Sequence, residues 1–421
     1  MPNKCKIWKA LSWAFPFVFL LSFLAFSSTS SFIIDGGLWQ GTHWNHRLLI
    51  ITPERLEVKD HILLYITGSE DIGRPLRYLL PLSSALKMPV GVIYDIPNQP
   101  LFGGLREDAL ISYSFKKFIL TNDPAWIIFN PMVKSVERAM DYLEEYFDHH
   151  FHVKIKGFIL AGASKRGWTT YLAGAKDKRV KGIIPLSFDN VNFLRTIPHQ
   201  LENWGTYSPD LRDYEKDGIL DMISSPLGKR LLKMVDPWYM KKRLRIPKLI
   251  VVGTNDTYWT IDAASLYFND LWGAKYIYYM PNKGHSLGWD NKIFFTLEKF
   301  IFSVIRNYKL PVFKFSYDYT KKEDRVYFRI KDKKLRPNAA SIWYATSYTK
   351  DFRKVIFREK PLFFSKTEKA FFGWIWLPES RFMAFYPEVK YKDKNNSYYL
   401  CAPAQIVKGQ LAHEEMVPKE K

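Results

Sequence analysis

One short stretch, residues 154–167, constrains the fold of this chain more than any other. It reads KIKGFILAGASKRG: an apolar run over 155–161, small residues around Ser164, and then a segment with a helical pattern. A buried strand that turns sharply into a helix with a serine at the corner is the geometry of a nucleophile elbow. Small neighbours are needed because larger side chains would collide with the strand or the helix. Arg166 stands where the usual G-x-S-x-G pattern has its second glycine, so an ordinary turn with a capping serine is the alternative.

Short apolar runs and amphipathic segments alternate from Trp44 to about residue 308. The clearest helix is expected across 132–147, where apolar residues fall on one face. Alternation of this kind predicts the α/β class, with a doubly wound, mostly parallel sheet covered by helices on both faces. Catalytic groups on such a sheet belong at the carboxyl ends of the strands. The runs that predict strands are 47–51, 62–67, 89–94, 155–161, 180–186, 248–252 and 275–280.

Residues 190–246 interrupt this α/β domain, which we assign to 31–308. The segment is aromatic and has no strong strand pattern, which predicts a helical insertion that covers the strand ends as a lid. The alternative is a set of connecting helices that only pack. We expect Trp204, Tyr207 and Trp259 to contact the substrate.

The last part of the chain has a different composition. Residues 309–412 are rich in β-forming residues with short polar breaks, which predicts a separate β-sandwich-like domain. Residues 413–421 form a polar tail.

The first 30 residues have the pattern of a secretory signal. Three lysines precede an apolar run over 10–26, and small polar residues follow it. We therefore expect an exported protein, periplasmic or secreted, with an uncleaved membrane anchor through 10–26 as the alternative. Cys5 falls in this segment and leaves Cys401 as the remaining thiol, so neither an internal disulfide nor a CxxC metal site is expected.

The charge balance favours an anionic partner. The chain has 62 Lys and Arg against 42 Asp and Glu, a formal net charge of +20. Such a field attracts anionic surfaces, including those of a bacterial envelope. Zinc-finger spacing, an arginine-rich tail and an RNA-binding aromatic signature are all absent from the sequence, so no nucleic acid partner is expected.

Two later strands supply the partners that a nucleophilic serine needs. A serine hydroxyl becomes a good nucleophile when a histidine accepts its proton and an acid holds that histidine. The strand at 248–252 leads to Asp256, and the strand at 275–280 leads to His285, in the chain order typical of serine hydrolases with a nucleophile elbow. Asp189 competes with Asp256 for the acid role. A helix cap for Asp256 and a surface loop for His285 are the alternatives.

An oxyanion intermediate needs two hydrogen-bond donors. One is expected from the backbone N–H of Lys165, directly after the serine, and the other from the loop at Gly68 and Ser69. The Lys165 side chain adds a hypothesis, because its charge could support the oxyanion or bind a substrate carboxylate. The alternative is a lysine that points into solvent.

A histidine-rich group follows the helix expected at 132–147. It contains Asp148, His149, His150 and His152, but it lies far from the expected catalytic edge. We interpret it as a solvated helix end and expect no metal and no cofactor.

Several motifs distributed over the chain carry a family resemblance. Together they resemble the PhoPQ-activated pathogenicity-related proteins, an exported bacterial family whose elbow has the same G-x-S-K-R-G pattern. The resemblance implies an α/β-hydrolase fold, with Ser164, Asp256 and His285 in the triad positions, and a link to virulence or to defence against cationic peptides. The elbow is also similar to that of glucuronoyl esterases, which makes an ester near a carboxylate one conceivable substrate. The motifs are GASKRGW (162–168), GTNDTYW (253–259), PNKGH (281–285), PNQPL (97–101), PMVKSVERAMDYL (131–143), WGTYS (204–208), VDPWYM (235–240) and DFR (351–353).

These observations predict an exported serine hydrolase that acts on an ester or amide in a small-molecule or peptide substrate. The alternative is a non-catalytic binding or signalling protein, built on a hydrolase scaffold, that engages an anionic envelope component.

Overall fold

The structure is a computed structural model that describes residues 27–69, 71–319, 325–332, 337–393 and 396–409. Most of the predicted signal segment and the whole polar tail lie outside the described residues. Within the described part of the chain, no helix is both long and apolar enough to cross a membrane.

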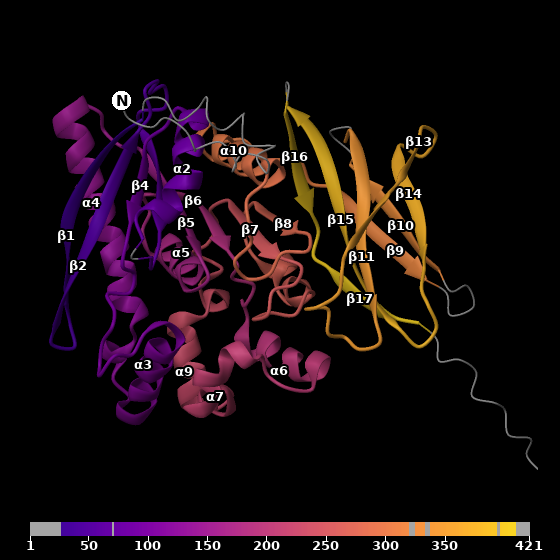
Figure 1. Cartoon of the computed structure of the whole chain (residues 1–421), viewed down its shortest axis with the longest axis horizontal. Coiled ribbons are helices and arrows are strands. Elements are labelled where there is room, and N and C mark those ends of the chain that lie inside the picture. Colours follow the sequence, from indigo (N-terminus) through magenta and orange to yellow (C-terminus); the bar gives the residue numbers. More distant parts are fainter. Residues whose placement is uncertain (1–26, 70, 320–324, 333–336, 394–395, 410–421) are drawn as a thin grey trace, which may run out of the picture.

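A mixed sheet forms the centre of the molecule (Figure 1). Its strands follow the order β1-β2-β4-β3-β5-β6-β7-β8, and β4, β3, β5, β6, β7 and β8 run parallel to one another. The predicted parallel sheet is therefore confirmed. Its inner strands are buried on both faces, which is why they read as continuous apolar runs. The bounds are β1 Ser28–Trp39, β2 Thr42–Thr52, β3 His61–Ile66, β4 Val90–Ile93, β5 Gly157–Ala163, β6 Val180–Leu186, β7 Lys248–Gly253 and β8 Lys275–Met280.

The edge strand β1 was not predicted. It pairs antiparallel with β2, and exposed residues recur along its length, as expected of a strand at a sheet edge. Its serine-rich start resembles the end of a signal segment, and the predicted boundary at residue 30 lies inside it.

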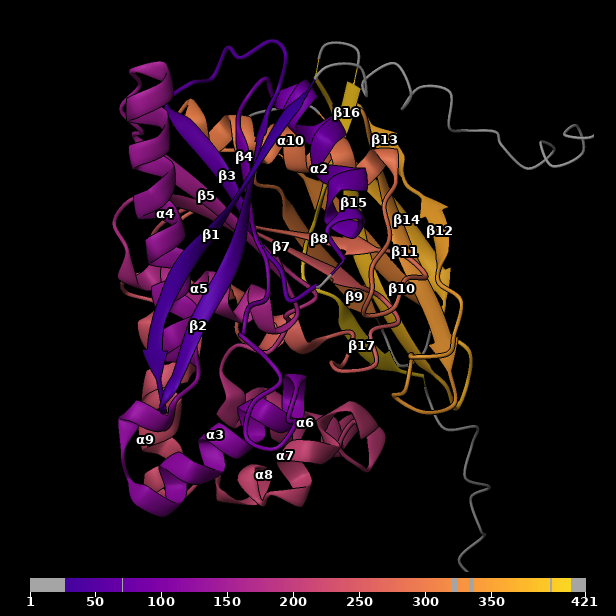
Figure 2. The ribbon, with the colours of Figure 1, turned by 60° about the vertical axis from the view of Figure 1, so that its left-hand side comes forward.

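Helices cover both faces of the central sheet (Figure 2). On one face α4 packs against β1 and α5, while α5 packs against β5 and β6. On the other face α10 contacts α2 and β6. The amphipathic pattern of α4 explains its position, because Met132, Val136, Leu143 and Phe147 are all buried on one side. The bounds are α2 Gly73–Leu86, α4 Phe129–Phe151, α5 Lys165–Lys176 and α10 Asn291–Ile305.

A helical cap lies at the carboxyl end of the strands, at the lower end of the view in Figure 2. The predicted insertion between β6 and β7 is helical, with α6 Phe193–Trp204, α7 Arg212–Lys216, α8 Ile219–Met222 and α9 Pro226–Val235. The cap also includes α3 Glu107–Thr121, which packs against α7, α8 and α9 and which the sequence did not assign to it. Short 3-10 turns are η1 Pro124–Trp126, η2 Pro209–Leu211, η3 Pro237–Met240, η4 Ala263–Leu266 and η5 Phe268–Asp270.

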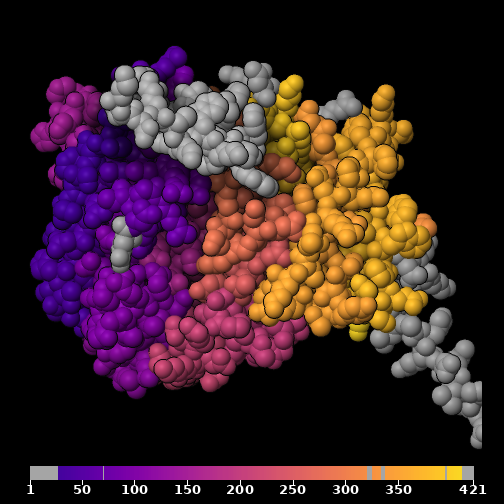
Figure 3. Space-filling view, in the orientation of Figure 1, coloured from indigo at the N-terminus to yellow at the C-terminus, as the bar shows by residue number. Residues whose placement is uncertain are grey.

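The C-terminal strands form two facing antiparallel layers. One is a separate sheet in the order β13-β14-β10-β9, and the other, β16-β15-β11-β12, continues the central sheet. The connection is the pairing of Cys401 in β16 with Ile277 in β8, a continuity that the sequence did not predict. The two parts of the chain lie side by side in the space-filling view (Figure 3). The bounds are β9 Lys314–Tyr319, β10 Arg325–Lys331, β11 Ala339–Ser347, β12 Arg358–Pro361, β13 Phe363–Ser365, β14 Ala370–Trp376, β15 Phe382–Asp393, β16 Asn396–Cys401 and β17 Gln405–Lys408.

Candidate active site

Ser164 lies at the sharp turn between β5 and α5. Its backbone has φ 57° and ψ −123°, a conformation that non-glycine residues rarely adopt. The turn requires the small residues around it, because a Cβ atom at Gly162 would lie 2.6 Å from the carbonyl oxygen of Arg166. At Gly167 a Cβ atom would lie 3.0 Å from two backbone oxygens. The strand–turn–helix geometry expected of residues 154–167 is thus present, with Arg166 in place of the second glycine.

His285 and Asp256 reach Ser164 from the ends of two other strands. The Nε2 atom of His285 is 2.8 Å from the Ser164 Oγ, and its Nδ1 atom is 2.9 and 3.0 Å from the two carboxylate oxygens of Asp256. The carboxylate also accepts a 2.8 Å hydrogen bond from the N–H of Tyr258. The Ser187 hydroxyl, after β6, donates to the carbonyl oxygen of His285 at 2.6 Å. The structure therefore brings the three predicted residues into one hydrogen-bonded chain.

The hydrogen bonds among Ser164, His285 and Asp256 define the direction of proton transfer. With the Asp256 carboxylate on Nδ1, the imidazole donates there and leaves Nε2 as an acceptor for the Ser164 hydroxyl proton. Asp256 is 4% exposed, so its contact with His285 is shielded from water. An arrangement of this kind can deprotonate a serine as it attacks a carbonyl carbon.

Asp189 does not take the acid position. It is buried and accepts a hydrogen bond from the Tyr267 hydroxyl, away from the imidazole. Burial, together with the nearby charge of Asp256, raises the pKa of Asp189 to about 7 despite that hydrogen bond. In the described part of the chain, Asp256 supplies the carboxylate that is hydrogen-bonded to His285.

The predicted oxyanion donors differ in their availability. The N–H of Lys165 belongs to the first turn of α5, where backbone N–H groups have no acceptor within the helix. The N–H of Ser69 already donates to the Thr67 hydroxyl at 3.1 Å. Gly68 packs so closely against Arg166 that a Cβ atom would lie 1.6 Å from a guanidinium nitrogen. Because the N–H of Ser69 is already used, the N–H of Gly68 remains the candidate for the second oxyanion donor in this loop.

The Lys165 side chain does not point into solvent. It is 8% exposed, and its Nζ lies 2.8 Å from an oxygen of Asp108 and 3.5 Å from one of Glu107. Both carboxylates belong to the first turn of α3. Because its charge is already balanced, Lys165 is poorly placed to add a full positive charge to an oxyanion or to a substrate carboxylate.

Asp108 joins the cap to the histidine, a role that the sequence analysis missed. Besides the Lys165 ammonium group, its carboxylate accepts hydrogen bonds from the hydroxyls of Tyr214 at 2.9 Å and Tyr258 at 3.0 Å. The Tyr258 ring lies against the imidazole of His285, with centroids 4.1 Å apart. In the sequence, Asp108 has only the appearance of an acidic residue in the first turn of a helix.

Arg166 fixes the loops around the elbow. Its guanidinium donates to both carboxylate oxygens of Glu107 at 2.7 and 2.8 Å and to the carbonyl oxygen of Ile96 at 2.5 Å. Gln99 also donates to Glu107, at 2.6 Å. Burial alone would raise the pKa of Glu107, but the hydrogen bonds and charge of Arg166, helped by Lys165, lower it to about 2.

A loop of the C-terminal region, residues 351–357, holds the loop that carries Asp256. We call it the clasp loop. Asn255 is adjacent to Asp256, and its side-chain amide donates to three backbone oxygens of the clasp loop. These belong to Phe352 at 3.1 Å, Arg353 at 3.3 Å and Val355 at 2.7 Å.

The clasp loop also contacts the loop of His285 and the cap. Asn282 donates to the carbonyl oxygen of Phe357 at 3.0 Å and accepts from its N–H at 2.7 Å. The guanidinium of Arg353 lies 4.0 Å from the ring centroid of Trp204, at the end of α6. Asn255, Asn282 and Arg353 all fall in motifs that the sequence singled out, but their contacts join distant segments and leave no local signal.

A narrow apolar pocket opens beside Ser164. Its volume is about 50 Å³, and Trp259 belongs to its wall. Trp204 and Tyr207 do not line it; Trp204 lies under Arg353 instead. Side chains from α3, α5, the loop after β6 and the cap insertion complete the pocket, among them Phe115, Trp168, Phe188, Leu211, Ile219, Leu231 and Leu232.

The histidine-rich group lies at the exposed carboxyl end of α4, as expected. Asp148, His149, His150 and His152 are exposed, and His150 stacks on Tyr146. Within the described ranges, no group of three or more His, Cys, Asp or Glu side chains is arranged to hold a metal ion.

The strand order, the elbow after β5 and the Ser–His–Asp arrangement at the strand ends define the α/β-hydrolase class. Within that class, the chain belongs to the PhoPQ-activated pathogenicity-related protein family, whose sequence model matches residues 34–353.

Comparison with individual proteins gives one curated relative and several solved structures. Autocrine proliferation repressor protein A from Dictyostelium discoideum is 29% identical over 332 residues, which cover 74% of this chain and 66% of that protein. Among solved structures, acetyl xylan esterase from Paenibacillus sp. R4 has a TM-score of 0.46 and 15% identity, over 67% of this chain and 84% of the other. Acylaminoacyl peptidase from Pyrococcus horikoshii has a TM-score of 0.47 and 12% identity, over 70% of this chain and 45% of the other.

Proposed function

We propose that this protein is an exported serine hydrolase that cleaves an ester or amide bond through an acyl-enzyme on Ser164. The observation that carries the proposal is the hydrogen-bonded chain in which His285 lies 2.8 Å from the Ser164 hydroxyl and 2.9 Å from Asp256. The basic, apolar and small-residue pattern of residues 1–30 supports export to the periplasm or the exterior, with or without an anchor through 10–26.

The proposed reaction has two halves. His285 accepts the Ser164 proton as the hydroxyl attacks the substrate carbonyl, and Asp256 orients the imidazole and stabilises its positive charge. The backbone N–H groups of Lys165 and Gly68 donate to the tetrahedral oxyanion. His285 then protonates the leaving group, and a water activated by the same imidazole releases the acyl group from Ser164.

The pocket beside Ser164 supports a small apolar group on the substrate. Its volume is about 50 Å³ and its walls are mostly aromatic and aliphatic. In the proposed enzyme, Trp259 contacts that group. Membership of the PhoPQ-activated family supports, as a proposed role, a contribution to virulence or to defence against cationic peptides.

A fluorophosphonate probe tests this proposal, because it reacts covalently with activated serines. We expect labelling of the natural protein and none of Ser164→Ala, followed by turnover in a panel of short-chain esters and aminoacyl amides. Ser397→Ala, in β16, is the matched control and keeps full labelling. Absence of labelling in the natural, folded protein would reject the proposal.

A second candidate is a non-catalytic binding or signalling protein on the same scaffold. The name of the Dictyostelium relative, a proliferation repressor, favours it, and the net charge of +20 suits an anionic partner surface. In a cell-based assay, Ser164→Ala would then be as active as the natural protein, whereas a hydrolase loses its effect with the serine.

A further inference from the structure

A large cleft opens at the amino ends of the parallel strands, opposite to the ends that carry Ser164. We call it the basal cleft. Its volume is about 1290 Å³, and its lining includes His61 at the start of β3, Lys181 near the start of β6 and Lys275 at the start of β8. Ser164, Asp256 and His285 follow the other ends of the strands, roughly 20 Å away for strands of six or seven residues. The C-terminal region closes the cleft with residues 311–313, 315–317 and 400–403.

The lining of the basal cleft is strongly basic. Among the residues that the structure describes, no aspartate and no glutamate lines it. Lys156 forms an ion pair with Asp60 at 2.7 Å. The cleft has four further cationic side chains, and no carboxylate among the described residues forms an ion pair with any of them. The lining cations are Lys156, Lys181, Arg245, Lys275 and Lys309.

Lys275 is held in the cleft by neutral groups. Its Nζ donates to the backbone oxygens of Asn269 at 2.5 Å and Leu271 at 2.8 Å, which fix the ammonium without neutralising it. Lys248 lies behind it, and burial first and then the charge of Lys275 lower the pKa of Lys248 to about 7. Burial also lowers the pKa of Lys275, although the charge of Asp270 opposes this, so an anion bound in the cleft would stabilise the ammonium form of both lysines.

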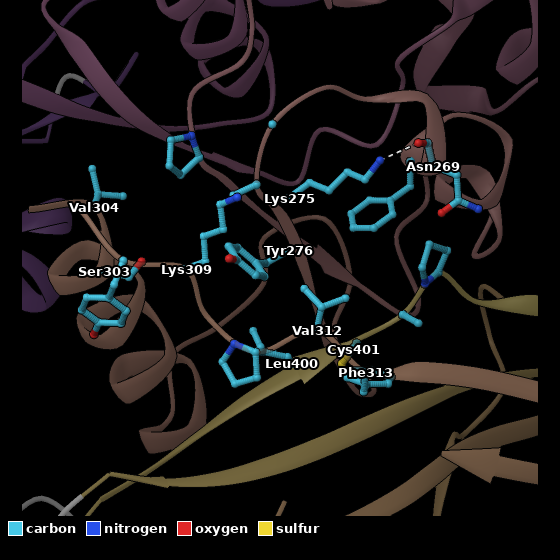
Figure 4. A pocket seen from close by; sticks show the side chains of 18 of the residues that line it. Asn269, Lys275, Tyr276, Ser303, Val304, Lys309, Val312, Phe313, Leu400 and Cys401 are labelled. Atoms are coloured by element: carbon cyan, nitrogen blue, oxygen red, sulfur yellow. Dashed lines mark hydrogen bonds between the residues drawn. The ribbon is translucent and has the colours of Figure 1, made fainter. Parts of the chain in front are cut away.

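The same cleft has an apolar side, where Val312 is exposed, Phe313 is half-buried and Leu400 is buried at its base. Figure 4 shows Lys275 and Lys309 on one side of the hollow and Val312, Phe313 and Leu400 on the other. Val312 is 77% exposed, which is unusual for a valine inside a concave site. An inorganic anion would leave this apolar side uncovered, and a neutral chain would leave the cations without a partner.

We propose that the basal cleft binds a single-chain anionic amphiphile, a molecule with one alkyl chain and a phosphate or carboxylate head. The head group lies among Lys181, Arg245, Lys275 and Lys309, and the chain covers the apolar side at Val312 and Phe313. Charge complementarity selects the head and apolar burial selects the chain. This site is independent of the chemistry proposed for Ser164, so either proposal can fail alone.

Isothermal titration with monomeric dodecyl phosphate tests the site. We expect saturable binding of one molecule per chain, with inorganic phosphate at least about a hundredfold weaker because it lacks the chain. Replacing three exposed cleft cations together, in Lys181→Gln, Arg245→Gln and Lys309→Gln, is expected to weaken dodecyl phosphate binding about tenfold or more.

The matched control replaces three exposed lysines outside the cleft, in Lys59→Gln, Lys229→Gln and Lys366→Gln. It changes the net charge equally and is expected to leave binding unchanged. Val312→Asn tests the apolar side and should weaken dodecyl phosphate severalfold without affecting inorganic phosphate. Equal weakening in both triple variants, equal affinity for the two phosphates, or no binding by the folded natural protein would each overturn the proposal.

Discussion

At the scale of single residues, Asp256 and Asp189 illustrate how similar side chains acquire different roles. Each follows a parallel strand and each is buried, yet only Asp256 reaches the imidazole of His285. Tyr267 holds Asp189 in place instead. The direction of the side chain after the strand decides the role, and sequence position does not reveal that direction.

The two aspartates give a first prediction. Asp256→Asn is expected to lower kcat by roughly a thousand- to ten-thousandfold, because an amide favours the wrong imidazole tautomer and cannot stabilise the imidazolium. The rate of fluorophosphonate labelling measures the same loss without a known substrate. Asp189→Asn is the matched control and should change the labelling rate by less than about threefold. A comparable loss in both variants would contradict the assignment of Asp256.

Asp189 also predicts a pH-dependent stability. Its pKa is raised from 3.8 to about 7 in the folded protein, so the folded state prefers the protonated acid. Stability from this group is therefore present below pH 3.8 and is lost as the pH rises through 7. Asn cannot ionise and can still accept from Tyr267. We expect the Tm of Asp189→Asn to gain on the natural protein by roughly 2–4 °C between pH 5 and pH 8. A gap in Tm that stays constant or shrinks over this range would argue against the raised pKa.

At the scale of elements, the clasp loop links the C-terminal region to the site. Asn255 and Asn282 hold it from the loops that carry Asp256 and His285, and Arg353 lies over Trp204 of the cap. Two loops and the end of α6 are thus tied to one segment. We infer that the clasp loop positions the acid and the histidine without touching substrate.

Asn255→Ala is the corresponding prediction. It removes three hydrogen bonds beside Asp256, and we expect kcat to fall about tenfold with little change in KM, together with a loss of about 1–3 kcal/mol in stability. The kinetics are measured well below Tm, so that unfolding does not contribute. Asn338→Ala is the control, because Asn338 accepts from the Lys392 N–H in the same region but does not contact the site. An unchanged kcat in a less stable Asn255→Ala protein would reduce the clasp loop to a packing role.

The elements that could be predicted are those specified by local pattern. The apolar runs before Ser164, Asp256 and His285 are strands because each is buried on both faces, and the chain order then brings their ends together. The membership of α3 in the cap could not be predicted. It depends on contacts such as the hydrogen bond from Ser112 to Asp217, which are 105 residues apart in the sequence. The clasp loop was visible only as a motif, because its contact with Asn255 spans 97 to 100 residues. Contacts of such separation have no periodicity from which to infer them.

At the scale of the whole molecule, the C-terminal strands complete the α/β-hydrolase fold of residues 31–308. β16 pairs with β8, the Tyr279 hydroxyl accepts from the Ala404 N–H at 3.1 Å, and the Tyr279 ring packs on Tyr386 with centroids 4.6 Å apart. Without these strands, the edge of β8 and the buried side chains of Ile277 and Tyr278 would face water. The same region closes the basal cleft at the amino ends of the parallel strands and supplies the clasp loop at their carboxyl ends. Both ends of these strands therefore depend on it.

A chain that ends after Asn307 tests this dependence. We expect it to aggregate or to expose apolar surface, because the uncovered edge of β8 offers unpaired backbone groups and apolar side chains to other molecules. The measurements are the soluble fraction after expression and the binding of a hydrophobic dye. A chain that ends at Gly409 retains every described strand and serves as the control, with the solubility of the natural protein. A soluble, monomeric chain 1–307 that still reacts with fluorophosphonate would show instead that the hydrolase part folds and orients Asp256 and His285 without the clasp loop.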